Sequence, residues 1–333
     1  MLDLESGFFR FSLLLTISLF GLVLIVGFVW ADPYAYDGPK DGDGWIICED
    51  TILSSDLVFS GDGLTICGDH VTLDLNGFKV LGSGSGVGVR ILSRKDVTVK
   101  GGSIKGFEFG IYVEDSSRVY IEDCRISDND FGAFIWLSSS VEVRRSEIAS
   151  NEIGVNIVSS SAIIRRNHIS ANGLHGIYLY DSEVSVQSNS IDNEEIGVFI
   201  WASTCILKEN MLEGNRIGVD AVSSKVEMTK NSISDSLEFG VYLDESEGLL
   251  KKNVILNCKN YGIYLLYSDV TLKQNTIALN RVGIAIYSSS PVIIDNLIIF
   301  NWEFGVYCSH DSDPYTARNI IKLNGIDYYK EEQ

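Results

Sequence analysis

A glycine followed by an aliphatic or small residue recurs at a nearly constant spacing through most of the chain. Successive copies are 21 or 22 residues apart, at Gly88, Gly110, Gly132, Gly154, Gly176, Gly197, Gly218, Gly240, Gly262, Gly283 and Gly305. A fixed period of this length indicates a solenoid, in which each unit packs only against its neighbours. An ordinary domain folded around one closed core would not need such a period.

Within each unit, counted from its glycine as place one, apolar residues alternate with polar ones. In the unit that begins at Gly176 they are Ile177, Leu179, Val184, Val186 and Ile191, at places two, four, nine, eleven and sixteen. Alternation with a period of two indicates short strands with one buried face, and no stretch has a helical period. Three strands per unit predict an all-β fold, a parallel β-helix of about eleven to twelve coils with about 4.8 Å between coils.

Asparagines form two further columns in the aligned units, and we expect them to stack at turns and to hydrogen-bond along the axis. The first column contains Asn167, Asn189, Asn210, Asn231, Asn253, Asn275, Asn296 and Asn319. The second contains Asn129, Asn151, Asn172, Asn193, Asn215, Asn257, Asn280, Asn301 and Asn324, interrupted by Ser236. A structural role is favoured for both columns over a catalytic one.

The pattern G-I-x-L, then S, V-x-L-x-x-N-x-I and N, resembles the right-handed parallel β-helix repeat of carbohydrate-binding proteins, sugar hydrolases and periplasmic NosD-type proteins. The segment Val71–Gly77, VTLDLNG, resembles the strand that follows the extended N-terminal stretch of such proteins. The resemblance covers about Trp45 to Gly325. It implies the fold, whereas the same scaffold carries lyases, hydrolases, epimerases, adhesins and accessory proteins.

Residues 11–30 form an uncharged apolar run of 20 residues, long enough to cross a bilayer as a helix. Arg10 precedes the run and several aspartates follow it, which predicts a cytoplasmic N-terminus and an extracytoplasmic remainder. An uncleaved single-pass anchor in the cell membrane is favoured over a signal peptide cleaved after Ala31, which would release a secreted protein.

The sequence thus divides into a membrane anchor or signal segment (1–31), a linker and N-terminal cap segment (32–85), the β-helix repeats (86–326) and a C-terminal tail (327–333). Cys48 and Cys67 flank the cap segment, and a disulfide between them is expected in an oxidising compartment. The other four cysteines are expected to be buried or near turns. No metal site and no cofactor are expected.

Aromatic residues recur at places three and five, which should point outward. Such a stripe suits the apolar faces of sugar rings, although stacking between coils is the alternative explanation. The candidate ligand-binding residues are Tyr112, Phe134, Trp136, Tyr178, Tyr180, Phe199, Trp201, Tyr242 and Tyr264.

Carboxylates interrupt the same stripe, and Asp220, Asp244 and Glu245 are weak candidates for a catalytic acid and base. Basic residues such as Arg144, Arg165 and Lys230 follow the second strand, and we expect a separate solvated stripe there.

The formal net charge of −19 argues against nucleic acid as a partner. The favoured function is binding of a polysaccharide or cell-surface glycan by a membrane-anchored extracytoplasmic protein. The alternatives are a polysaccharide-active enzyme (hydrolase, lyase or epimerase) and a NosD-like accessory protein of a membrane complex.

Overall fold

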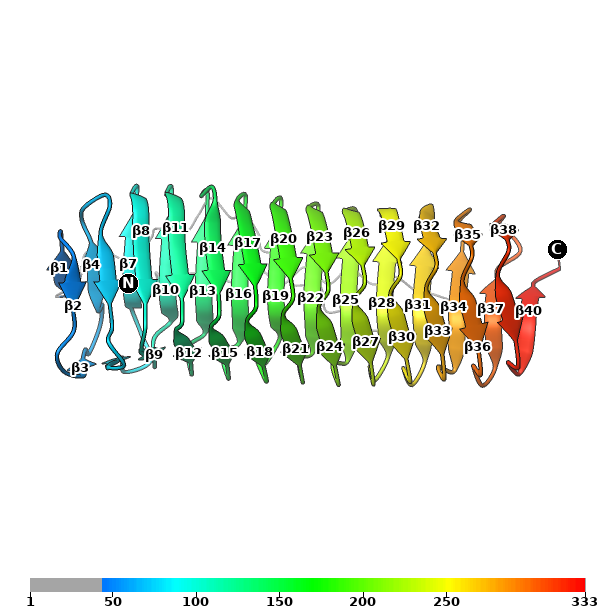
Figure 1. Cartoon of the computed structure of the whole chain (residues 1–333), viewed down its shortest axis with the longest axis horizontal. Helices are drawn as coiled ribbons and strands as arrows, with labels where there is room; N and C mark the ends of the chain where they lie inside the picture. The colour runs from blue at the N-terminus through cyan, green and yellow to red at the C-terminus, as the bar shows by residue number, and fades with distance from the viewer. Residues whose placement is uncertain (1–43, 333) are drawn as a thin grey trace, which may run out of the picture. The chain divides into compact units, whose positions relative to one another are not determined.

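The computed structural model describes residues 44–332, which fold as stacked coils of three strands each (Figure 1). All neighbouring strands are parallel, and each strand pairs with the equivalent strand of the next coil, so three long sheets run along the stack. This confirms the predicted all-β parallel β-helix. Within residues 44–332 no helix is long and apolar enough to cross a membrane, and the predicted anchor at 11–30 lies outside the described residues.

We name the sheets A, B and C in chain order. Sheet A contains fourteen strands: β1 (Trp45–Ile47), β4 (Leu64–Ile66), β7 (Val87–Leu92), β10 (Phe109–Glu114), β13 (Phe131–Trp136), β16 (Ile153–Val158), β19 (His175–Tyr180), β22 (Ile196–Trp201), β25 (Ile217–Val222), β28 (Phe239–Asp244), β31 (Tyr261–Leu266), β34 (Val282–Tyr287), β37 (Phe304–Cys308) and β40 (Ile326–Lys330).

Sheet B contains thirteen strands: β2 (Thr51–Ile52), β5 (Thr72–Asp74), β8 (Lys95–Lys100), β11 (Ser117–Glu122), β14 (Val141–Arg144), β17 (Ser161–Arg165), β20 (Glu183–Gln187), β23 (Thr204–Lys208), β26 (Lys225–Thr229), β29 (Glu247–Lys251), β32 (Val270–Lys273), β35 (Val292–Ile294) and β38 (Tyr315–Ala317).

Sheet C also contains thirteen: β3 (Leu57–Val58), β6 (Lys79–Leu81), β9 (Ser103–Lys105), β12 (Arg125–Ser127), β15 (Glu147–Ala149), β18 (His168–Ser170), β21 (Ser190–Asp192), β24 (Met211–Glu213), β27 (Ser232–Ser234), β30 (Val254–Leu256), β33 (Thr276–Ala278), β36 (Leu297–Ile299) and β39 (Ile320–Lys322).

The stack has about thirteen turns, more than the eleven to twelve that the glycine repeat predicts. The difference lies at the N-terminal end, where the segment predicted as a cap already forms coils. β1 pairs with β4 and β4 with β7, in parallel register with the repeats that follow. The equivalent glycines of these first coils, Gly44 and Gly63, are spaced by 19 and 25 residues instead of 21 or 22, so the period alone could not count them.

The core is a column of aliphatic side chains from all three sheets. Ile177 and Leu179 of β19, Val184 and Val186 of β20 and Ile191 of β21 are all buried, as their places in the repeat predict. In register, Ile177 pairs with Val155 and Val198 on the neighbouring strands. Equal places therefore stack on equal places, which joins the coils into one hydrophobic core.

At most corners the chain turns through one residue with a positive φ, followed by a residue that points inward and is usually polar. The first asparagine column forms such a ladder. Asn189 Nδ2 donates to Asn210 Oδ1 at 3.0 Å and to the carbonyl of Ile164 at 2.8 Å, and Asn210 repeats the pattern with Asn231. Buried backbone groups at the turns are satisfied in this way.

The second ladder differs from the predicted column at two coils. Glu194 rather than Asn193, and Cys258 rather than Asn257, occupy the inward position. Asn193 and Asn257 are the preceding residues and have φ values of 59° and 56°. Asparagine tolerates this left-handed conformation well, which explains why it occurs at the position just before the ladder in these two coils.

The repeated glycine is required by the close approach of the coils at the start of each sheet A strand. A Cβ on Gly110 would lie 2.6 Å from the carbonyl oxygen of Gly132 and 2.9 Å from Ile126 Cγ2. Neither the backbone nor the core can yield at such distances, so the period of glycine follows from the stacking itself.

Cys48 and Cys67 form a disulfide between the first two coils, with their Cα atoms 4.8 Å apart. Cys124, Cys205, Cys258 and Cys308 are free and buried. Burial raises the pKa of the Cys124 thiol to about 12 and that of Cys258 to about 11, so these thiols stay protonated.

Candidate functional site

The outer surface of sheet A carries two aromatic columns that pack against each other. One column is at place three, and the other consists of the residues that precede each glycine. Phe109 stacks on Phe131 with ring centroids 5.0 Å apart, and both meet Phe134 edge to face. Phe239, Tyr242, Tyr261 and Tyr264 form a similar group. The rings thus form a second hydrophobic layer outside sheet A.

This packing corrects the expected exposure of the place-three residues. Tyr112, Tyr178 and Tyr242 point away from the core, as predicted, but they are buried. Phe134, Phe199 and Tyr264 are half-buried. The stacking explanation therefore accounts for this column, and few of its ring faces are open to a ligand.

The place-five column is more accessible. Trp136, Tyr180 and Trp201 are all half-buried, and the rings of Tyr180 and Trp201 lie 4.8 Å apart on adjacent strands. Each of them directly precedes a corner residue: Leu137, Asp181 and Ala202 respectively. These three aromatics therefore border the corner between sheets A and B.

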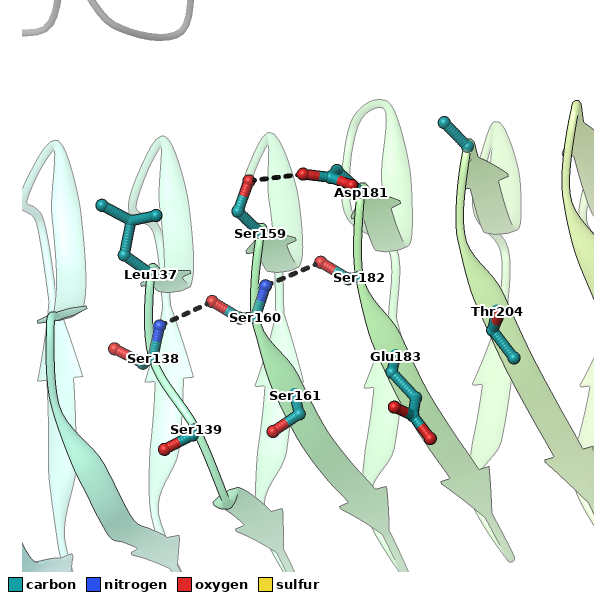
Figure 2. A pocket seen from close by; sticks show the side chains of 11 residues that line it. Leu137, Ser138, Ser139, Ser159, Ser160, Ser161, Asp181, Ser182, Glu183 and Thr204 are labelled. Atoms are coloured by element: carbon teal, nitrogen blue, oxygen red, sulfur yellow. Dashed lines mark hydrogen bonds between the residues drawn. The ribbon is translucent and has the colours of Figure 1, made fainter.

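Along that corner runs a shallow hollow of about 540 Å³ (Figure 2). Most of the residues that line it carry a hydroxyl or carboxyl group: Ser138, Ser139, Ser159, Ser160, Ser161, Asp181, Ser182, Glu183 and Thr204. Leu137 and Ala202 complete the lining. The inward serines form a third ladder, which the sequence analysis missed: the Ser160 amide donates to Ser182 Oγ, and the Ser138 amide to Ser160 Oγ. Ser159 Oγ donates to Asp181 Oδ2 at 3.0 Å.

The candidate catalytic carboxylates separate onto two surfaces. Asp220 and Asp244 lie on adjacent strands of sheet A, two places out of register, with their Cα atoms roughly 8 Å apart. Burial raises the pKa of Asp220 to about 7, and burial also raises the pKa of Asp244. Glu245 lies instead at the corner, where it accepts a hydrogen bond from Ser223. With only 4% of Asp220 exposed, this carboxyl offers a substrate little access.

Two polar residues of the sheet A surface were missed as well. His175 lies beside Phe199, with ring centroids 5.3 Å apart, and burial lowers the pKa of its imidazole to about 4. Asn156 is buried at place three. Among residues 44–332, His175 Nδ1, Asn156 Oδ1 and Asp220 Oδ1 are buried without a hydrogen-bond partner.

The predicted stripe of basic residues after the second strand also contains carboxylates, which form ion pairs with its arginines. Arg144 lies 2.5 Å from Glu122 Oε2 and 3.1 Å from Glu142 Oε1, and Arg165 lies 2.5 Å from the same Glu142 oxygen. Arg145 pairs with Asp123. These ion pairs between coils neutralise the part of the stripe that Arg144, Arg145 and Arg165 form.

In residues 44–332 no group of three or more His, Cys, Asp or Glu side chains is placed to hold a metal ion.

The fold and the corner hollow define the class of the protein as a parallel β-helix with a polar groove beside aromatic residues. The model of the family described as "Right handed beta helix region" matches residues 63–217 and 215–332. The chain belongs to this family. No curated protein matches it in sequence.

Three solved structures share the fold. The A-module of the mannuronan C-5 epimerase AlgE6 from Azotobacter vinelandii is 14% identical, with 88% of each chain covered and a TM-score of 0.59. The pre-mature gene product 12 of bacteriophage phi29 is 12% identical over 86% of this chain and 52% of its own, with a TM-score of 0.56. A double mutant of the periplasmic alginate epimerase AlgG is 14% identical, with 77% of each chain covered and a TM-score of 0.53. At these identities the likeness concerns the fold.

Proposed function

We propose that this protein binds a glycan at the corner between sheets A and B, and that residues 11–30 anchor it in the cell membrane with the β-helix outside the cytoplasm. The observation that carries the binding proposal is the half-buried pair Tyr180 and Trp201 beside the hydroxyl-lined hollow. Aromatic faces bind the apolar faces of sugar rings, and the surrounding hydroxyl and carboxyl groups bind sugar hydroxyls.

The names of two structural neighbours support a carbohydrate partner, since both are epimerases named for alginate or mannuronan. We favour binding over catalysis because Asp220, whose carboxyl has a pKa raised to about 7, is buried within the ring layer between Phe199 and Tyr242. An accessory role of NosD type stays a prediction from the sequence resemblance.

The test is Trp201→Ala, measured by binding to an array of immobilised polysaccharides and by thermal unfolding. We expect binding to weaken at least tenfold, about 1.4 kcal/mol, with only a small fall in the melting temperature, because the ring is half-exposed.

The matched control is Trp302→Ala, which removes a tryptophan that is 77% exposed and lies outside sheet A. It should leave glycan binding unchanged. Intact binding in Trp201→Ala, or an equal loss in both variants, would remove the main support for a site at this corner.

A further inference from the structure

The coils of this chain recur in blocks of three. First coils begin GVRILS, GVNIVS and GVDAVS; second coils begin GIYVED, GIYLYD and GVYLDE; third coils begin GAFIWL, GVFIWA and GIYLLY. The first coils start at Gly88, Gly154 and Gly218, so the blocks are 154 − 88 = 66 and 218 − 154 = 64 residues long. We call residues 88–153, 154–217 and 218–282 blocks one, two and three.

The structure repeats with the same period at the corner between sheets A and B. In every block the first coil supplies a serine and the second coil a carboxylate that accepts its hydrogen bond. Ser93 Oγ lies 2.9 Å from Asp115 Oδ2, Ser159 Oγ lies 3.0 Å from Asp181 Oδ2, and Ser223 Oγ lies 3.2 Å from Glu245 Oε2. All six residues have a positive φ, so the corners share one backbone geometry.

A second hollow lies one block further along the same corner. Its volume is about 570 Å³, against about 540 Å³ for the first. It is lined by the equivalents of the same residues: Ala202, Ser203, Thr204, Ser223, Ser224, Lys225, Glu245, Ser246, Glu247, Tyr267 and Asp269. Asp181 and Glu183 of the first hollow thus correspond to Glu245 and Glu247 of the second.

From this repetition we infer that the two hollows are successive subsites for one linear, uncharged glycan that lies along the corner. The inference deepens the proposed function and rests on it. The subsites are three strand spacings apart, or roughly 14 Å, so only a chain of several sugars can occupy both.

The charge of the corner selects against anionic polymers. The two hollows carry Asp181, Glu183, Glu245, Glu247 and Asp269, and their one cation, Lys225, lies 3.7 Å from Glu247. A polyuronate would place its own carboxylates beside these groups, whereas the hydroxyls of an uncharged sugar can donate to them. The ligand class therefore differs from the polymers named for the two epimerases.

Two linked subsites also predict a dependence on ligand length. A short oligosaccharide fills each hollow independently, while a chain that spans both binds the second hollow intramolecularly and gains affinity without any new contact.

The experiment first screens the full-length protein against glucan, mannan and xylan, with oligomannuronates as the anionic probe. Oligosaccharides of two to ten sugars from the best uncharged ligand are then titrated calorimetrically against the wild type, Glu183→Ala, Glu247→Ala and the double variant. Glu213→Ala, which removes an exposed carboxylate of sheet C, is the control.

We expect short oligosaccharides to bind the wild type at two sites and each single variant at one. The first site should be the tighter, because Tyr180 and Trp201 border it, whereas Asp244 and Leu266 occupy the equivalent places beside the second. A spanning chain should bind the wild type at least tenfold more tightly, and each single variant should reduce its affinity to that of the short ones. The double variant should bind neither, and Glu213→Ala should behave as the wild type.

Several outcomes overturn the inference. If Glu183→Ala abolishes binding while Glu247→Ala has no effect, the second hollow is not a subsite, although the proposed glycan function stands. Preferential binding of oligomannuronate would show that the ligand is anionic, which overturns the inferred ligand class but not the two subsites. Binding to none of the four polymers, together with no effect of Trp201→Ala, removes the proposed function as well.

Discussion

Glu194 shows how a single residue can disturb a ladder built from amides. It replaces an asparagine, and its two carboxylate oxygens accept hydrogen bonds of 2.8 Å from the Asn172 amide and Nδ2. Burial nevertheless outweighs these two bonds and raises the pKa of Glu194 from 4.5 to about 8. The folded protein therefore favours the neutral carboxyl over the charged one.

This shift predicts a pH-dependent stability. Because the folded pKa lies above the unfolded one, the contribution is complete below about pH 4.5 and is lost as the pH rises towards 8. Glu194→Gln carries no charge at any pH. We expect it to raise the free energy of unfolding at pH 9 by an amount on the order of 2 kcal/mol and to flatten the decline between pH 5 and 8.

Urea denaturation at pH 5, 7 and 9 measures the effect, with Glu213→Gln as the exposed control that should follow the wild type. A variant that keeps the wild-type decline would show that another group titrates in this range.

For single residues, the sequence predicted the two asparagine columns correctly but did not identify every residue in them. Counting asparagines selected Asn193 and Asn257, because asparagine suits both the ladder and the left-handed residue before it. Serine recurs just as regularly, every 21 or 22 residues from Ser116 to Ser289, but the period does not show that it points inward, since serine is also a common residue of exposed turns.

The strands of sheet A show where the rule of alternation fails. Phe109 and Tyr112 are three residues apart, yet both belong to the layer outside sheet A, because the pleat shifts at Gly110. Alternation counted from the glycine therefore missed the column that precedes it. Alternation correctly predicted that the place-three rings point away from the core. It did not predict that they are buried, because their burial depends on rings of the neighbouring coils.

A test of the glycine constraint compares two substitutions. A Cβ on Gly197 would lie 2.6 Å from the carbonyl oxygen of Gly218, whereas a Cβ on Gly173 would have no neighbour closer than 3.8 Å. Gly197→Ala should lower the free energy of unfolding by about 1–3 kcal/mol, and Gly173→Ala should leave it nearly unchanged. Denaturant midpoints at a constant m value measure both, and equal effects would contradict the close approach.

Across residues 44–332 the coils repeat in blocks of three. We expect one whole block to be removable without loss of folding, because the order of the coils is then preserved. Deleting residues 154–217 joins Ile153 to Gly218, which restores the junction between a third and a first coil. We expect a folded, shorter β-helix with a smaller m value, since less surface is exposed on unfolding.

Deleting residues 154–185 is the matched control, because it joins a strand of sheet A to the middle of a strand of sheet B. This variant should lose cooperative unfolding. A cooperative transition in both variants, or in neither, would show that the phase of the coils does not govern folding.

The three ladders also give the stack a direction. The backbone amide of each ladder residue donates to the coil that follows it, as Asn253 does to Asn275 and Ser246 to Ser268. The side-chain Nδ2 of Asn253 also donates to the Met228 carbonyl of the coil that precedes it. Loss of a coil from the N-terminal end therefore leaves side-chain amides without their acceptors, and loss of a coil from the C-terminal end leaves backbone N–H groups without theirs. Proteins rarely tolerate either kind of buried unpaired donor, so the ladders oppose fraying from both ends of the stack.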